Sequence, residues 1–286
     1  MSNLPDLATL WNYDQPDQSE RDFRALLPVV QNDPANLSYE LELLTQIARA
    51  QGLQRHFEEG HQTLDDVERR MTPGTTVEVR YLLERGRLFR SNKQSDQARP
   101  FFERAWELGQ QIGEAGYAVD AAHMLGILDA PDLTWNLKAL DLAETSPDER
   151  ARRWRASLYN NIGWSYHDLG EYDRALALFG KALALREEEN NAETIRIARW
   201  AVARTLRSLN RLDEALALQR ENAAQIQRDG GSDGYIEEEI GEILLAQGYT
   251  QAAKSHFARA YEQLSLDDWL VEREPARLER LGKLAN

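Results

Sequence analysis

The residue types that most often carry out chemistry are few and scattered in this chain of 286 residues. There is no cysteine, which excludes disulfides, thiolate metal sites, iron–sulfur clusters and cysteine nucleophiles. No two of the five histidines are three or four residues apart, so no helix face offers a histidine pair to a metal. The sequence also has no glycine-rich phosphate loop, nucleophile elbow or His-Glu-x-x-His motif. We therefore predict no catalytic residue, no cofactor and no metal, leaving open only a metal site assembled from distant helices.

Acidic residues outnumber basic ones by 48 to 34, which gives a formal net charge of −14. Such a balance repels polyanions on average and argues against nucleic acid or an anionic membrane as the main partner. The two acidic runs, residues 187–189 and 237–239, are interpreted as solvated helix faces. No basic residue precedes Arg21, which is not the pattern of a signal peptide. The apolar runs are far shorter than the ~20 residues of a membrane helix, so we expect a cytoplasmic protein.

The elements that must position any site are helices. Ala, Leu, Glu, Arg and Gln dominate the sequence, and all of them favour helix. The chain has only 17 glycines and 9 prolines, and Val, Ile and Thr do not alternate with polar residues as they do in strands. We predict an all-α chain, and the next property to examine is internal repetition.

One segment, residues 156–186, shows a two-helix pattern clearly. Its first half carries Tyr159, Ile162, Gly163 and Tyr166 on one helix side, and its second half carries small and aromatic residues at Ala175, Phe179 and Ala182. Gly170 separates the halves, as a glycine does at a helix end. The unit resembles the tetratricopeptide repeat, and Gly163 is expected to let its two helices approach closely.

Similar units are predicted upstream around Gly86 and Phe102, and downstream around Gly241 and Phe257, with weaker copies between and before them. The spacing of 40 residues from Ala175 to Ala215 (215 − 175) exceeds the ~34 of the basic repeat. It resembles the long repeats of kinesin light chains. The resemblance implies a right-handed superhelical solenoid of antiparallel helix pairs, forming one domain over residues 1–286. We expect an N-terminal helix at 17–31, about six repeats over 38–264 and a capping helix at 266–284 that is interrupted or starts afresh at Pro275.

The resemblance also implies that the first helix of each pair lines a concave surface on which peptides bind. The residues expected on the inward-facing side of the first helices are rich in arginine. They include two tryptophans that are candidate stacking platforms for a ligand. The predicted binding residues are Arg49, Arg80, Arg87, Arg90, His123, Asn160, Trp164, His167, Trp200, Arg204 and Arg207. The full projection holds six arginines and four acids, which predicts an inner surface of net +2. Arg87 and Arg204 are expected to be exposed and to contribute little to stability.

The function that this pattern favours is a non-enzymatic protein- or peptide-binding module. Its ligand is expected to have acidic or carboxylate character, because arginine binds carboxylates in bidentate fashion. The alternative is a structural assembly role, such as a homo-oligomer formed through the ends or the convex face. An enzyme is the least favoured of the three classes.

Overall fold

The computed structural model describes residues 4–31, 33–228 and 230–286. Over these residues the chain forms α-helices and short 3-10 helices and contains no strand, which confirms the predicted all-α class. Two compact units can be distinguished: unit 1 extends to Leu158 and unit 2 begins at Tyr159. The expectation of one continuous domain stays a prediction, and each unit is described by itself.

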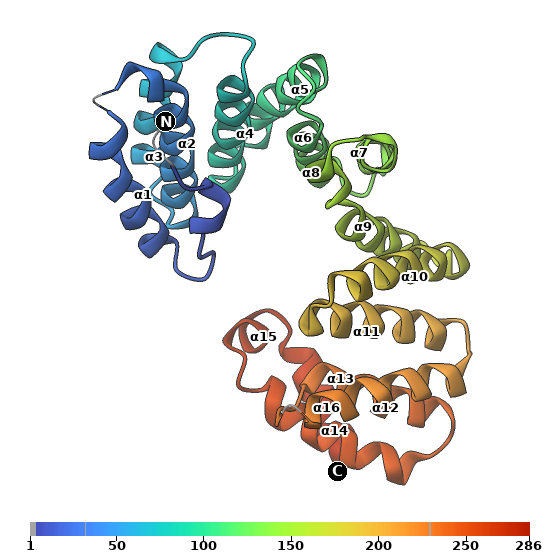
Figure 1. The fold of residues 1–286 in the computed structure, drawn as a ribbon. Helices are drawn as coiled ribbons and strands as arrows, with labels where there is room; N and C mark the ends of the chain where they lie inside the picture. The colour runs from blue at the N-terminus through green and yellow to red at the C-terminus, as the bar shows by residue number, and fades with distance from the viewer. Residues whose placement is uncertain (1–3, 32, 229) are drawn as a thin grey trace. The chain divides into compact units, whose positions relative to one another are not determined.

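Unit 1 is a row of antiparallel helix pairs (Figure 1). Helices α2 and α3, α4 and α5, and α6 and α7 pack as neighbours, and α1 packs against α2. The predicted N-terminal helix corresponds to α1. The elements of unit 1 are η1 (Leu7–Leu10), α1 (Pro16–Val30), η2 (Pro34–Asn36), α2 (Leu37–Leu53), α3 (Phe57–Arg70), α4 (Thr76–Ser91), α5 (Ser95–Gln111), α6 (Ala115–Leu128), α7 (Thr134–Thr145), α8 (Glu149–Arg152) and the start of α9 (Arg155–Asp168).

Unit 2 continues with the rest of α9, which forms the fourth helix pair with α10, followed by two further pairs (Figure 1). Its elements are α10 (Tyr172–Glu189), α11 (Ala192–Ser208), α12 (Leu212–Arg228), α13 (Gly234–Ala246), α14 (Thr250–Leu264), α15 (Asp268–Arg273) and α16 (Pro275–Ala285). The six pairs agree with the predicted repeat number. The starts of α9, α11 and α13 are 37 (192 − 155) and 42 (234 − 192) residues apart, which are long repeats.

The capping segment predicted at 266–284 forms two helices, α15 and α16, and the second starts afresh at Pro275. Glu274 has φ −128° and ψ 45°, outside the helical region, and so ends α15. Pro275 then occupies the first position of α16, where its missing N–H costs no backbone hydrogen bond. Leu278 and Leu281 of α16 complete the apolar core that α16 shares with α14.

A glycine facing a phenylalanine holds three of the helix pairs together. A Cβ atom at Gly86 would lie 2.6 Å from the ring of Phe102, and one at Gly163 would lie 2.8 Å from the ring of Phe179. The same arrangement recurs at Gly241, and all three rings are buried. The predicted close contact at Gly163 is therefore confirmed. Gly170, which follows α9, has φ +77°, a left-handed conformation that favours glycine.

Candidate functional site

Unit 1 contains a cavity of about 1050 Å³, here called groove 1. The first helices α2, α4 and α6 line it, as the sequence predicts, through residues such as Glu42, Arg80 and Tyr117. The segment before α1 and the region around α8 contribute the remaining walls, which the sequence does not predict. Groove 1 therefore has a larger and more varied lining than the repeats alone provide.

The arginines of groove 1 connect neighbouring first helices. Arg87 of α4 donates to Glu84 at 2.6 Å and to Asp120 of α6 at 2.5 Å. Arg49 of α2 donates to the same Glu84 at 3.2 Å. Burial alone would lower the pKa of Arg87, but Asp120 and Glu84 outweigh it and raise that pKa. Arg87 is buried between its partners, so the expectation that it is an exposed position is wrong.

Arg80 also links neighbouring helices, two turns before Arg87 on α4. Its Nη1 donates to Glu42 of α2 at 2.9 Å and to the hydroxyl of Tyr117 of α6 at 2.9 Å. Its guanidinium group also lies 5.6 Å from the centre of the Tyr117 ring. The arginines of groove 1 therefore act first as links between three successive helix pairs.

Aromatic residues before α1 form part of the wall of groove 1. The rings of Trp11 and Tyr13 stack with their centres 4.8 Å apart, and the Arg49 guanidinium lies 5.8 and 5.6 Å from them. The indole N–H of Trp11 donates to Gln46 of α2 at 2.9 Å. Because these residues precede the first repeat, projection from the repeat pattern cannot place them. The aromatic pair Trp-x-Tyr is the only sequence signal that could have drawn attention to them.

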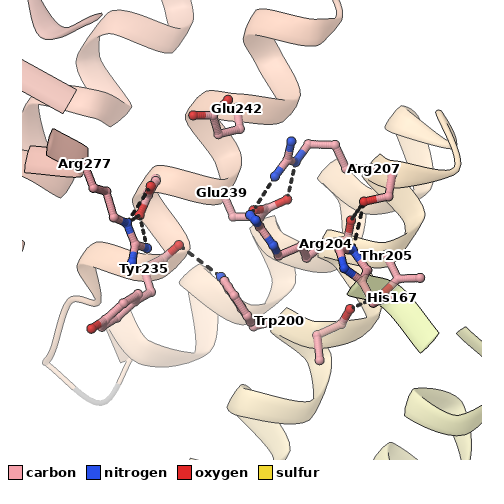
Figure 2. A network of polar contacts seen from close by, with 12 residues as sticks. His167, Trp200, Arg204, Thr205, Arg207, Tyr235, Glu239, Glu242 and Arg277 are labelled. Carbon is pink, nitrogen blue, oxygen red and sulfur yellow. Dashed lines mark hydrogen bonds and ion pairs between the residues drawn. The ribbon is translucent and has the colours of Figure 1, made fainter. Parts of the chain in front are cut away.

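Unit 2 contains a second cavity, of about 430 Å³, here called groove 2. It is lined by Trp200, Arg204 and Arg207 of α11, by carboxylates of α13 and by two arginines of α16. Figure 2 shows the centre of this network, where Arg204 and Arg207 both point toward Glu239 of α13. Their distances to the Glu239 carboxylate are 3.2 and 2.5 Å.

Helix α16 completes groove 2 through two further ion pairs with α13. Arg277 binds Glu238 at 2.5 Å, and Arg280 pairs with Glu242. The sequence did not predict this contribution of α16. A signal for it exists, because the pair Arg277 and Arg280 and the pair Glu238 and Glu242 each occupy one helix face and carry opposite charges.

Six of the predicted binding residues line the two grooves: Arg49, Arg80 and Arg87 line groove 1, and Trp200, Arg204 and Arg207 line groove 2. Arg90 lies outside both. It lines a smaller pocket of about 200 Å³ in unit 1, together with Arg49 and Met124. His123 lies against the ring of Trp154, with the ring centres 5.3 Å apart.

Asn160, Trp164 and His167 are not among the residues that line groove 2. Trp164 packs against Phe179 at 4.9 Å and against Trp200 at 5.7 Å between ring centres. His167 shares a hydrogen bond of 3.0 Å with Ser208, and burial together with the charge of Arg204 lowers its pKa. The amide of Asn160 contacts Asn161 at 3.4 Å. Trp164 and His167 thus connect α9 with α11, through Trp200 and Ser208.

The charge balance of the grooves differs from the projected net +2. Glu84 and Asp120 in unit 1 and Glu239 in unit 2 were omitted from the projection, although each accepts from a predicted arginine. The interpretation of residues 237–239 as a solvated face is also wrong. Glu239 is only 1% exposed, and Glu237 is buried against His256 and Arg259. Residues 187–189 are exposed, as predicted.

In groove 2 the carboxylates are the buried partners and the guanidinium groups are the exposed ones. Glu239 is 1% exposed while Arg204 is 38% exposed, and Glu242 is 14% exposed while Arg280 is 50% exposed. A ligand in this groove therefore meets guanidinium groups that are more exposed than their carboxylate partners, although Glu238, Glu242 and Glu274 also line the cavity. Groove 1 shows the same asymmetry between Arg150, 54% exposed, and Glu114, 19% exposed, whereas Arg87 and Asp120 are exposed to about the same extent.

The repeat sequence and the fold of this chain are both similar to those of known proteins. The sequence model of the tetratricopeptide repeat matches residues 155–194, the α9–α10 pair. The apo form of RapI has a TM-score of 0.71 at 13% identity, covering 92% of this chain and 74% of its own. NprR in complex with its cognate peptide NprX has a TM-score of 0.52 at 16% identity, covering 98% of this chain and 80% of its own. No curated protein sequence matches.

A Rap protein complexed with competence and sporulation factor is also similar, with a TM-score of 0.50 and 16% identity over 90% of this chain and 76% of its own. At these identities the likeness concerns the fold. The molecule is thus an all-α protein built from repeated helix pairs. More particularly, it is a repeat protein of the tetratricopeptide type, in which residues 155–194 match the sequence pattern of the repeat itself.

Proposed function

We propose that this chain is a non-enzymatic protein- or peptide-binding protein whose ligand has acidic or carboxylate character. The observation that carries the proposal is the asymmetry of the ion pairs in groove 2. The buried carboxylates Glu239 and Glu242 hold their arginines in place, while the guanidinium groups face the cavity. Guanidinium groups keep several N–H donors, so Arg204 and Arg280 can bind a ligand carboxylate without losing their protein partners.

The chemistry of the described residues supports binding in preference to catalysis. Within residues 4–31, 33–228 and 230–286, no group of three His, Asp or Glu side chains is arranged to hold a metal ion. None of the helices described there is long and apolar enough to cross a membrane. Among proteins of similar fold, NprR has been solved in complex with its cognate peptide NprX. By this likeness of fold, we propose a peptide as the class of ligand that this chain binds.

The experiment that tests the proposal is selection of a displayed random octapeptide library on the purified protein. We expect enriched peptides with more Asp and Glu than the library, and weaker binding as salt rises from about 0.05 to 0.5 M, because salt screens exposed charge pairs. Arg280→Gln should weaken binding of the enriched peptides, whereas Arg69→Gln, at an exposed arginine outside both grooves, should not. Enriched peptides without acidic residues would overturn the proposed ligand character, and no enrichment at all would overturn peptide binding.

An assembly role is the second candidate, and three exposed apolar side chains in and just before α15 favour it. Leu266, Trp269 and Val271 are exposed side chains of unit 2, all of them large and apolar. Exposed apolar patches of this kind often mark a surface that associates with another protein. Sedimentation equilibrium over a hundredfold range of concentration should show a dimer that Trp269→Glu dissociates. A monomer at all concentrations would exclude this role.

A further inference from the structure

A small apolar pocket of about 220 Å³ opens beside groove 2. Ile197 and Trp200 of α11 form one wall, and Tyr235 and Ile236 at the start of α13 form the other. An engineered protein cavity of about 150 Å³ can hold benzene, so this pocket has room for one large apolar side chain. It is smaller than the ~300 Å³ or more that drug-sized ligands occupy, which indicates a subsite for one side chain.

The polar groups around this pocket are already satisfied by one another. Arg196 and Asp233 form an ion pair at 3.2 Å across its rim, and Asp233 also accepts from the backbone N–H of Tyr235 at 2.9 Å. The indole N–H of Trp200 donates to the backbone oxygen of Tyr235 at 3.2 Å, as Figure 2 shows. The Asp233 carboxylate and the Trp200 indole N–H are therefore occupied, and the walls formed by Ile197, Trp200, Tyr235 and Ile236 offer a ligand mainly apolar contact.

The pocket and groove 2 share Trp200, which lines both. The guanidinium of Arg204 lies 5.6 Å from the centre of the Trp200 ring, on the groove side. In an extended peptide, residues two positions apart lie on the same side of the chain and about 7 Å apart. One such pair can thus reach the pocket with its first side chain and Arg204 with its second.

We propose that this pocket is a specificity subsite for a large apolar side chain of a bound peptide, with Asp or Glu two positions away in that peptide. The inference rests on the proposed peptide-binding function and adds the sequence that the ligand must carry. Arg204 has one ion pair with Glu239, at 3.2 Å, and is partly exposed, so it can accept the ligand carboxylate as a second partner. Trp200 fixes the separation between the apolar and the anionic contact.

The peptides selected from the octapeptide library provide the test. We expect enrichment of Phe, Leu, Ile, Met or Trp at two positions from Asp or Glu. Ile197→Glu should weaken binding of these peptides at least tenfold, because it places a carboxylate at the mouth of the pocket. Ile197 is 53% exposed, so the variant should keep its fold, which circular dichroism and thermal unfolding will check. Leu169→Glu makes the same change at another exposed apolar residue of unit 2 and should alter binding less than twofold.

Labelling with 5-fluorotryptophan locates the bound peptide directly. A saturating selected peptide should shift the ¹⁹F resonance that disappears in the Trp200→Phe variant. Selected peptides that lack the apolar–acidic pair, or that bind Ile197→Glu as tightly as the parent, would overturn the subsite and leave peptide binding intact. If the library yields no binder, the proposed function fails and the subsite fails with it.

Discussion

The two units contain the same pattern of two arginines on a first helix, but these arginines have different surroundings in each unit. Each unit has a pair of arginines three residues apart on a first helix, Arg87 and Arg90 on α4 and Arg204 and Arg207 on α11. In unit 1, Arg87 is buried between two carboxylates and Arg90 lies outside groove 1. In unit 2, both arginines converge on one buried carboxylate, Glu239, and line groove 2.

The difference shows that the number of charges on a helix face does not determine what that face offers a ligand. Arg87 has acids on both sides, from α4 itself and from α6, so its donors are consumed within the protein. Arg204 pairs with one carboxylate, that of Glu239, and its guanidinium keeps further N–H donors for a ligand in groove 2. We infer that Arg87 mainly joins repeats in unit 1, whereas Arg204 in unit 2 is also available to a ligand.

The largest expected effect tests whether the two units are stabilised independently. Gly163→Leu in unit 2 and Gly86→Leu in unit 1 should each cost about 3 kcal/mol, because the new side chain overlaps a buried phenylalanine ring. Chemical denaturation monitored by circular dichroism measures the loss. If the units unfold separately, each substitution will shift one of two transitions. A single transition shifted equally by both variants would show one cooperative domain, as the sequence suggested.

Removing a buried carboxylate from each unit should give the next largest effect. Glu239→Ala should cost about 2–3 kcal/mol, because both Arg204 and Arg207 lose their buried partner. Glu84→Ala should cost less, since Arg87 keeps Asp120. Urea unfolding of the two variants measures the difference, and the exposed Glu188→Ala serves as a control. Equal costs would contradict the inferred difference between the two arginine networks.

Much of the fold was predictable because it depends on local pattern. The glycine–phenylalanine contact of each strong repeat can be recognised from residue types and spacing, and Gly163 with Phe179 lies where the pattern predicts. The position of Pro275 indicated a break, but spacing alone could not decide between an interruption and a fresh helix. The exposed apolar side chains in and just before α15 and the short α8 have no repeat signal at all.

The grooves were less predictable, because their chemistry depends on contacts between helices far apart in sequence. Projection found Arg204 and Arg207 but missed Glu239, which belongs to a helix 35 and 32 residues further on. It also missed Trp11, which reaches groove 1 from outside the repeats. Residue type and helical phase thus predict which arginines face inward, while their partners require the packed structure.

A binding measurement distinguishes the two grooves as ligand sites. Arg204→Gln should weaken a selected acidic peptide about tenfold, or about 1.4 kcal/mol, because it removes a charge-assisted bond. Its fold should persist, since Glu239 retains Arg207. Arg49→Gln, the matched change in groove 1, should leave binding unchanged. Fluorescence anisotropy with a labelled peptide measures both, and the reverse result would place the ligand in groove 1.

Two histidines should make the units differ in sensitivity to acid, the smallest effect considered. Burial, together with nearby arginines, lowers the pKa of both His123 in unit 1 and His167 in unit 2. The unfolded chain, with a histidine pKa of about 6.5, then binds more protons than the folded chain. Stability is therefore complete above about pH 6.5 and decreases as the pH falls toward the lowered folded-state pKa.

The loss should be greater in unit 1, because Nδ1 of His123 has no hydrogen-bond partner in the described part of the chain, whereas His167 contacts Ser208. Protonation of His123 adds a charged donor to a half-buried site against Trp154. We expect His123→Gln to flatten the dependence of the unfolding free energy on pH between 6.5 and 5 more than His167→Gln does. Urea unfolding of the parent and both variants at a series of pH values measures this difference. A steeper dependence in His123→Gln than in the parent would show that its imidazole is stabilised by protonation, and that Asp120 outweighs burial at this site.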